Sequence, residues 1–201
     1  WESSLEWYRL ANERVAARLG GYHSARILLD SLDFAEIEAL QVQDDWDSAG
    51  ALLADRARAL EAAGAEILVL ATNTMHLVAD RITDAVGIPF LHIADAAGAA
   101  VSAAGVETVG LLGTAFTMEK PFYAERLAAQ GIRTIVPDAD DRRTVHDVIY
   151  GELVHGVVRD ESRQSYVEVV DRLIARGAQG VILGCTEIEL LLSADDVSVP
   201  V

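Results

Sequence analysis

Short apolar runs alternate along the chain with segments whose apolar and polar positions repeat at helical spacing. The apolar runs are rich in valine, isoleucine and leucine, which predicts buried strands of parallel sheets. Strands are expected at residues 25–31, 66–70, 89–92, 107–112, 132–136 and 179–183. Helices are expected at residues 1–19, 33–40, 46–63, 74–85, 95–104, 117–130, 141–155, 161–176 and 186–192. This alternation predicts an α/β fold in which helices flank parallel sheets on both faces.

The second half of the chain repeats the pattern of the first half. The segment GAEILVLATNT, residues 64–74, aligns with GAQGVILGCTE, residues 177–187, and this places Thr72 opposite Cys185. A further apolar run containing a proline follows each segment. A duplication of such a long period predicts two similar half-domains.

The repeat sets the expected domain boundaries. We expect a first half-domain at residues 1–94 and a second at residues 95–201, both Rossmann-like and related by a pseudo-twofold axis. In the second half, a strand and a glycine-containing loop, residues 106–114, come before the helix that aligns with the first helix of the chain. The first half opens directly on a helical pattern, so an equivalent strand and loop are expected to precede Trp1. The C-terminal end of the chain is expected to pack back on the first half.

The repeat also predicts where a ligand binds. Parallel α/β sheets bind ligands beyond the carboxyl ends of their strands. Thr72 and Cys185 both follow a predicted strand directly, one in each half. The pseudo-twofold axis is therefore expected to bring them to opposite sides of one cleft.

Composition narrows the classes of function. The chain has 32 acidic and 16 basic residues and a formal net charge of −16, which argues against nucleic-acid binding because phosphates require a basic surface. The single cysteine cannot form an intrachain disulfide, so a reducing, cytoplasmic location is predicted. No apolar run approaches the ~18 residues of a membrane span, and no membrane association is expected.

The two turns together resemble those of the aspartate/glutamate racemase family, which includes relatives acting on hydantoins and substituted malonates. The family signature is Cys-Asn-Thr in the first half and Gly-Cys-Thr-Glu in the second. This chain has Thr72-Asn73-Thr74 and Gly184-Cys185-Thr186-Glu187. The resemblance covers essentially the whole chain. It is closer to the broad-specificity branch with Thr-Asn-Thr-Met-His than to the main aspartate branch.

The resemblance implies an isomerase: a PLP-independent amino-acid racemase of D-amino acid metabolism. It implies a small-molecule amino-acid substrate, a homodimer, and no cofactor or metal. Members of the aspartate branch hold the distal carboxylate with an arginine and a lysine. At the aligned positions this chain has Gln41, a candidate substrate-binding residue, and no lysine near residues 154–156. A strict preference for aspartate is therefore not expected.

Racemisation requires acid/base groups on both faces of the α-carbon. Cys185 is the expected catalytic group, since a helix N-terminus lowers the pKa of a thiol from its usual ~8.5. Thr72 is the candidate for the opposite face, although a hydroxyl is a much weaker acid. We expect His76, one helical turn further on, to activate Thr72 through a hydrogen bond. Thr72 as a plain turn or N-cap residue, and His76 as a structural histidine, remain alternatives.

Hydroxyl and amide side chains near both turns are candidates for binding the α-carboxylate and the charge that develops on it. These residues are Asn73, Thr74, Thr114, Thr117 and Thr186. Glu187 is a candidate supporting residue, or simply a carboxylate in the first turn of a helix.

Two other functions fit the same pattern. A decarboxylase or isomerase of malonate- or maleate-type acids needs only one cysteine, and this chain has one. A small-molecule binding module that has lost one catalytic group is the second alternative. The retained Asn73 and Thr74 favour the racemase, while His92 is expected to be structural and no metal site is expected.

Overall fold

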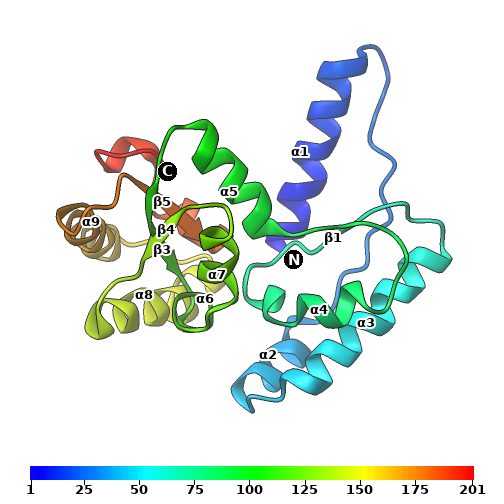
Figure 1. Cartoon of the computed structure of the whole chain (residues 1–201), viewed down its shortest axis with the longest axis horizontal. Helices are drawn as coiled ribbons and strands as arrows, with labels where there is room; N and C mark the ends of the chain where they lie inside the picture. The colour runs from blue at the N-terminus through cyan, green and yellow to red at the C-terminus, as the bar shows by residue number, and fades with distance from the viewer. The chain divides into compact units, whose positions relative to one another are not determined.

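A computed structural model describes residues 1–201 and divides the chain into two compact units (Figure 1). The first unit consists of residues 1–71 and 78–91. The second consists of residues 72–77 and 92–201. The short segment 72–77 thus belongs to the second unit, although the residues on either side of it belong to the first.

The first unit contains a two-stranded parallel sheet, and most of its residues lie in helices. The helices are α1 (Glu2–Leu19), α2 (Phe34–Val42), α3 (Trp46–Ala62) and α4 (Ala79–Thr83). Strand β1 (Leu68–Val69) pairs in parallel with β2 (Phe90–Leu91). The side chains of Asp33 and Asp45 accept hydrogen bonds from backbone N–H groups in the first turns of α2 and α3, which is why these helices begin where they do.

The strand predicted at residues 25–31 is wrong. The segment is not part of either sheet. Its apolar side chains Ile27, Leu28 and Leu29 are 38%, 49% and 59% exposed. An apolar run predicts a strand only where a neighbouring strand pairs with it, and the described chain provides no such neighbour here.

The second unit contains a three-stranded parallel sheet in the order β4-β3-β5. The strands are β3 (Thr108–Gly113), β4 (Arg133–Ile135) and β5 (Gly180–Gly184). The helices are α5 (Ile93–Ala103), α6 (Ala115–Glu119), α7 (Phe122–Ala128), α8 (Ala139–Gly151) and α9 (Asp160–Ala175). Shorter 3-10 segments are η1 (Thr74–Val78), η2 (Leu153–His155), η3 (Thr186–Leu190) and η4 (Ala194–Asp196). No helix of the chain is both long and apolar enough to cross a bilayer.

A proline interrupts the single helix predicted at residues 117–130. Pro121 is the N-cap residue of α7, and Lys120 before it has an extended backbone with ψ of 143°. A residue that precedes proline is driven out of the helical region by the proline ring. The segment therefore forms α6 and α7 in place of one helix.

Helices cover both faces of the three-stranded sheet (Figure 1). Every residue of β3 is buried. Leu112 packs with residues of α8 and α9, including Val145 and Leu173. Val109 and Leu111, which point to the other face, pack with Ala94 of α5 and with α7. The predicted parallel sheet with helices on both faces is confirmed.

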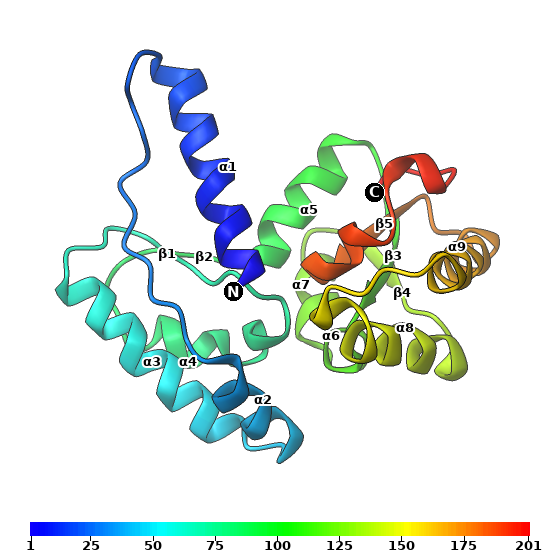
Figure 2. The same cartoon turned by 180° about the vertical axis from the view of Figure 1, so that it is seen from behind.

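The sequence repeat is also a repeat of local structure. Gly64 and Gly177 each come shortly after the end of a helix, and both glycines have a positive φ, 96° and 100° respectively. Glycine is the residue that adopts this left-handed conformation at low cost. Leu68 N–H then donates to the Pro89 carbonyl at 2.8 Å, and Val181 N–H donates to the Pro200 carbonyl at 2.9 Å. Figure 2 shows the C-terminal segment beside β5. The two units are built to the same local plan.

Candidate active site

The carboxyl ends of β3 and β5 place two predicted site residues next to each other. Gly113 and Gly184 are the last residues of these strands and are paired across the ladder. Thr114 and Cys185 follow them directly, so both leave the sheet at the same edge. A Cβ atom on Gly184 would lie 2.8 Å from the Leu112 carbonyl oxygen. The close approach of the two strands at this edge therefore depends on glycine.

Three buried threonines converge at this edge of the sheet. The Oγ1 atom of Thr74 lies 3.0 Å from that of Thr114 and 3.4 Å from that of Thr117. Thr114 and Thr117 are themselves 3.3 Å apart. The Thr117 side chain also packs against Gly184, where its Cγ2 would be 3.2 Å from an added Cβ. These contacts pack the segment 72–77, the loop after β3 and the end of β5 into one group.

The Cys185 thiol is hydrogen-bonded to a carboxylate. Its Sγ donates to Oε2 of Glu187 at 2.8 Å, and the Thr186 hydroxyl donates to the same oxygen at 3.1 Å. Burial, followed by the negative charge of Glu187 and this hydrogen bond, raises the pKa of the Cys185 thiol well above its usual range. The resting pair is therefore a thiol and a carboxylate.

The prediction that a helix N-terminus lowers the thiol pKa is wrong. The expected helix at residues 186–192 is the 3-10 segment η3, which has five residues. Such a short segment has a small dipole. Burial of Cys185 and the charge of Glu187 both act in the opposite direction.

His76 contacts the backbone of Thr72. Its Nδ1 lies 2.7 Å from the Thr72 carbonyl oxygen, and its Nε2 accepts a hydrogen bond from Ile93 N–H at 3.1 Å. The ring is 2% exposed, and burial together with the neighbouring His92 lowers the pKa of His76 to about 4. Both ring nitrogens bond to backbone groups, which differs from the expected bond between His76 and the Thr72 hydroxyl.

Asn73 has a buried polar atom without a partner. Its Oδ1 is buried and makes no hydrogen bond. A buried amide oxygen without a donor costs free energy of about 1–3 kcal/mol, so this position favours a ligand that brings a polar group. The other predicted residues are Thr72, which is half-buried beside Asn73, and Gln41, which is buried on α2 of the first unit.

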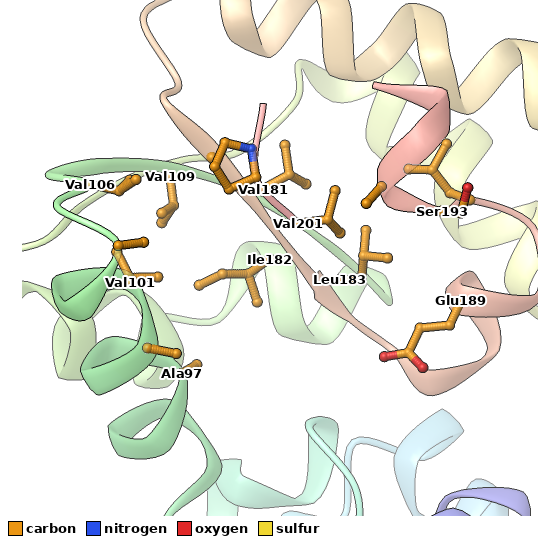
Figure 3. Close-up of a pocket in the computed structure, with 16 residues that line it drawn as sticks. Ala97, Val101, Val106, Val109, Val181, Ile182, Leu183, Glu189, Ser193 and Val201 are labelled. Atoms are coloured by element: carbon orange, nitrogen blue, oxygen red, sulfur yellow. The ribbon is translucent and has the colours of Figure 1, made fainter. Parts of the chain in front are cut away.

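A hollow of about 520 Å³ in the second unit lies apart from these residues. Its walls are aliphatic side chains of α5, β5 and the C-terminal segment, with Glu189 and Ser193 at one end (Figure 3). None of the predicted site residues lines it. No group of three or more His, Cys, Asp or Glu side chains is arranged to hold a metal ion. The two turns, and not this hollow, carry the candidate chemistry.

His92 has the structural role expected from the sequence, whereas the need for glycine at position 184 was not predicted. His92 is the N-cap of α5, where its Nδ1 accepts from Ala94 N–H at 3.1 Å, and its ring centroid lies 4.4 Å from that of His76. Gly184 is required by packing, as described above. Histidine is not among the residues that usually mark an N-cap in a sequence, and the packing around Gly184 depends on strand pairing that a single sequence does not show.

The chain belongs to the Asp/Glu/Hydantoin racemase family, whose pattern it matches over residues 1–201. The fold, the two turns and the comparison with the family all agree on this class.

Solved structures give the same result. A candidate Asp/Glu racemase from Yersinia pestis is 51% identical, with a TM-score of 0.93 over 100% of this chain and 87% of that chain. An aspartate racemase homologue from Pyrococcus horikoshii OT3 is 32% identical, with a TM-score of 0.82 over 99% of this chain and 87% of that chain. An aspartate racemase from Picrophilus torridus shares the fold at 20% identity, with a TM-score of 0.66 over 96% of this chain and 80% of that chain.

Proposed function

We propose that this protein is a PLP-independent amino-acid racemase of the aspartate/glutamate type, which interconverts L- and D-amino acids by removing and returning the α-proton. The observation that carries the proposal is the Cys185–Glu187 pair, with 2.8 Å between sulfur and oxygen, in a chain of the racemase family. A thiol bonded to a carboxylate is an acid with its own proton acceptor.

The raised pKa of Cys185 defines the role of each partner. When Cys185 acts as the base, its thiol proton moves to Glu187, and the thiolate takes the α-proton of the substrate. The product of this step is a substrate carbanion beside a thiol and a protonated Glu187. When Cys185 acts as the acid, the resting thiol gives its proton to the carbanion and becomes a thiolate beside the Glu187 carboxylate. A proton from water then restores the thiol.

Thr72 is proposed to serve the opposite face of the α-carbon. Its hydroxyl is a far weaker acid than a thiol, so it relays a proton from water less effectively than Cys185 transfers one. The two enantiomers then react at different rates. The equilibrium constant remains one, because the enantiomers have equal free energy in solution.

The substrate carboxylate is proposed to bind near the threonine cluster formed by Thr74, Thr114 and Thr117. Their hydroxyl groups lie 3.0–3.4 Å apart and provide donors for the charge that develops as the α-proton leaves. The unpaired Asn73 Oδ1 can accept a hydrogen bond from the α-ammonium group of the substrate. With the side-chain amide rotated by 180°, its NH2 group would instead donate to a substrate carboxylate. Thr186 and Gln41 are proposed as further substrate contacts, with Gln41 in place of the arginine of the aspartate branch.

The test is α-proton exchange in D2O with single enantiomers of a panel of amino acids. Deuterium uptake and chirality are followed together for the native protein, Cys185→Ala and Thr72→Ala. Uptake with inversion that is lost in Cys185→Ala supports the proposal. Uptake with retention in the native protein would remove Thr72 from proton transfer, and absence of uptake from every amino acid would contradict the racemase.

One observation favours a second function. The chain has a single cysteine, which is enough for a decarboxylase or isomerase of malonate- or maleate-type acids. The same assay run with arylmalonates and maleate separates the two: product formation without amino-acid exchange supports the second function. Binding of these compounds without turnover supports a non-catalytic module.

The assembly state is part of the proposal. The family resemblance implies a homodimer, and light scattering coupled to size exclusion measures the mass directly. A monomer mass of 21.6 kDa at assay concentration would contradict the proposed dimer.

A further inference from the structure

Two imidazole rings satisfy the first two backbone N–H groups of α5. The first four N–H groups of a helix have no partner within the helix. Ile93 N–H, the first in α5, donates to His76 Nε2 at 3.1 Å, and Ala94 N–H donates to His92 Nδ1 at 3.1 Å. The two rings are in edge contact with centroids 4.4 Å apart. One cap is local, whereas the other comes from the segment 72–77.

These contacts assign the tautomers. His76 Nε2 accepts from Ile93, so its proton is on Nδ1, which donates to the Thr72 carbonyl at 2.7 Å. His92 Nδ1 accepts from Ala94, so its proton is on Nε2. The two neighbouring histidines therefore hold opposite tautomers, and both are neutral.

We propose that His76 is a positioning residue of the active site: as the neutral Nδ1–H tautomer it ties the Thr72 carbonyl to the first N–H of α5 and holds the turn that carries Thr72, Asn73 and Thr74. The His76 backbone N–H also donates to the Asn73 carbonyl at 3.0 Å, so ring and backbone together fix this turn. The catalytic consequence rests on the racemase proposal above, whereas the tautomer assignment does not.

The surroundings of His76 keep the ring neutral. A protonated His76 would point an Nε2–H group at the Ile93 N–H, so two donors would face each other. Desolvation and the neighbouring His92 oppose the positive charge, and Arg126 does so more weakly. Asp95 on α5 is the nearby acidic group, and it is already paired with Arg126 through two hydrogen bonds of 2.8 and 2.9 Å.

We call the link that His76 makes between the Thr72 carbonyl and the Ile93 N–H the clamp. It is tested directly by nitrogen-15 NMR of the histidine side chains. The chain has five histidines, and the His76→Asn and His92→Asn variants assign the two signals. His76 is expected to show the Nδ1–H pattern and His92 the Nε2–H pattern. His76 should keep this pattern from pH 8 to pH 5.5, across the ~6.5 at which an unperturbed imidazole protonates. An Nε2–H pattern for His76, or its protonation within this range, overturns the proposal.

Two substitutions separate the bonds of His76. In His76→Asn the side-chain amide replaces Nδ1 and keeps the donor to Thr72, while in His76→Gln the amide oxygen replaces Nε2 and keeps the acceptor for Ile93. Because the active-site turn is held through Thr72, kcat per folded molecule should fall by about 10- to 100-fold in His76→Gln and by clearly less in His76→Asn. His23→Asn, at an exposed position of the first unit, is the control and should behave as the native protein.

The outcomes separate the two proposals. Equal kcat per folded molecule in both His76 variants and the native protein contradicts the positioning role. The expected tautomers in a protein that exchanges no α-proton support the clamp and contradict the racemase. Racemase activity together with the opposite His76 tautomer supports the racemase and contradicts the clamp.

Discussion

At Cys185 a single neighbour has two opposed effects. The Glu187 carboxylate raises the pKa of the thiol and also provides the oxygen, 2.8 Å away, that accepts its proton. The sulfur is therefore a weak nucleophile in the resting protein, although it is placed for proton transfer. A substitution that removes the Glu187 carboxylate should then raise the rate of thiol alkylation and lower the rate of proton transfer.

Glu187→Gln separates these two effects. Removing the charge lowers the thiol pKa toward its ordinary range, so alkylation of Cys185 by iodoacetamide at pH 8 should become about 10-fold faster. Racemisation should become about 100-fold slower, because the proton acceptor is lost. The single cysteine of the chain makes alkylation measurable by intact mass.

The control for this substitution is Glu189→Gln, two residues further along η3 on an exposed side chain. It should leave both rates near the native values. Slower alkylation in Glu187→Gln, or unchanged turnover, would contradict the assigned roles.

Gly184 is the second residue where the structure makes a sharp prediction. A methyl group in Gly184→Ala meets the Leu112 carbonyl at 2.8 Å and the Thr117 side chain at 3.2 Å. The overpacking should lower the free energy of unfolding by ~1–3 kcal/mol and displace Cys185. Gly151→Ala is the matched control, since no atom lies within 4 Å of its added Cβ, and urea unfolding of both measures the difference. Equal stability of the two variants is the result that would falsify this packing argument.

At the scale of elements, the alternation of strands and helices was predictable because each element carries its own signals. Asp138, whose side chain accepts from the first turn of α8, marks the start of that helix in the sequence. The failures have a different origin. Residues 25–31 have a strand-like pattern but no pairing strand, and the segment after Cys185 has a helical pattern but forms only η3. Both depend on neighbours distant in the chain.

The capped N-terminus of α5 predicts an acid-sensitive stability. The pKa of His76 is about 4 in the folded protein and ~6.5 in an unfolded chain. Between these values the unfolded state binds more protons, so the free energy of unfolding falls as pH decreases, by at most ~1.4 kcal/mol per pH unit from this residue. The stabilisation that neutral His76 contributes is complete above pH ~6.5 and is lost as the pH falls from there toward about 4.

Urea unfolding at half-unit steps from pH 7 to pH 4 measures this slope. The His76→Asn variant should show a shallower dependence than the native protein, and His23→Asn should match the native curve. Parallel curves for the native protein and His76→Asn would show that His76 carries no such linkage.

At the scale of the whole molecule, the repeat in the sequence is what points to the candidate site. Matching the two halves singled out the turns at Thr72 and Cys185, and the ends of β3 and β5 lie together as expected for parallel strands. The electrostatics of the site were not predictable. Burial sets the pKa of Cys185 and of His76, and burial depends on packing among segments that the sequence alone does not place.

The net charge of −16 predicts that salt stabilises this protein. Like charges on a compact molecule repel, and NaCl screens them with a Debye length of ~10 Å at 0.1 M. The melting temperature should rise by about 2–4 °C between 20 and 200 mM NaCl, equivalent to roughly 1 kcal/mol. Differential scanning calorimetry measures it, with KCl as the control for ion identity. A decrease would mean that surface ion pairs such as Arg172–Asp141 outweigh the repulsion.

The segment 72–77 has a consequence for protein engineering. A fragment of residues 92–201 looks like a separable module from its sheet and helices, and it contains both Cys185 and Glu187. It would nevertheless lack the Thr74 hydroxyl and the His76 ring, leaving Ile93 N–H without its acceptor. Transplanting this site to another scaffold therefore requires residues 72–77 to be included as well, although residues 78–91, which separate them from the fragment, belong to the first unit. The functional unit is discontinuous in the coding sequence.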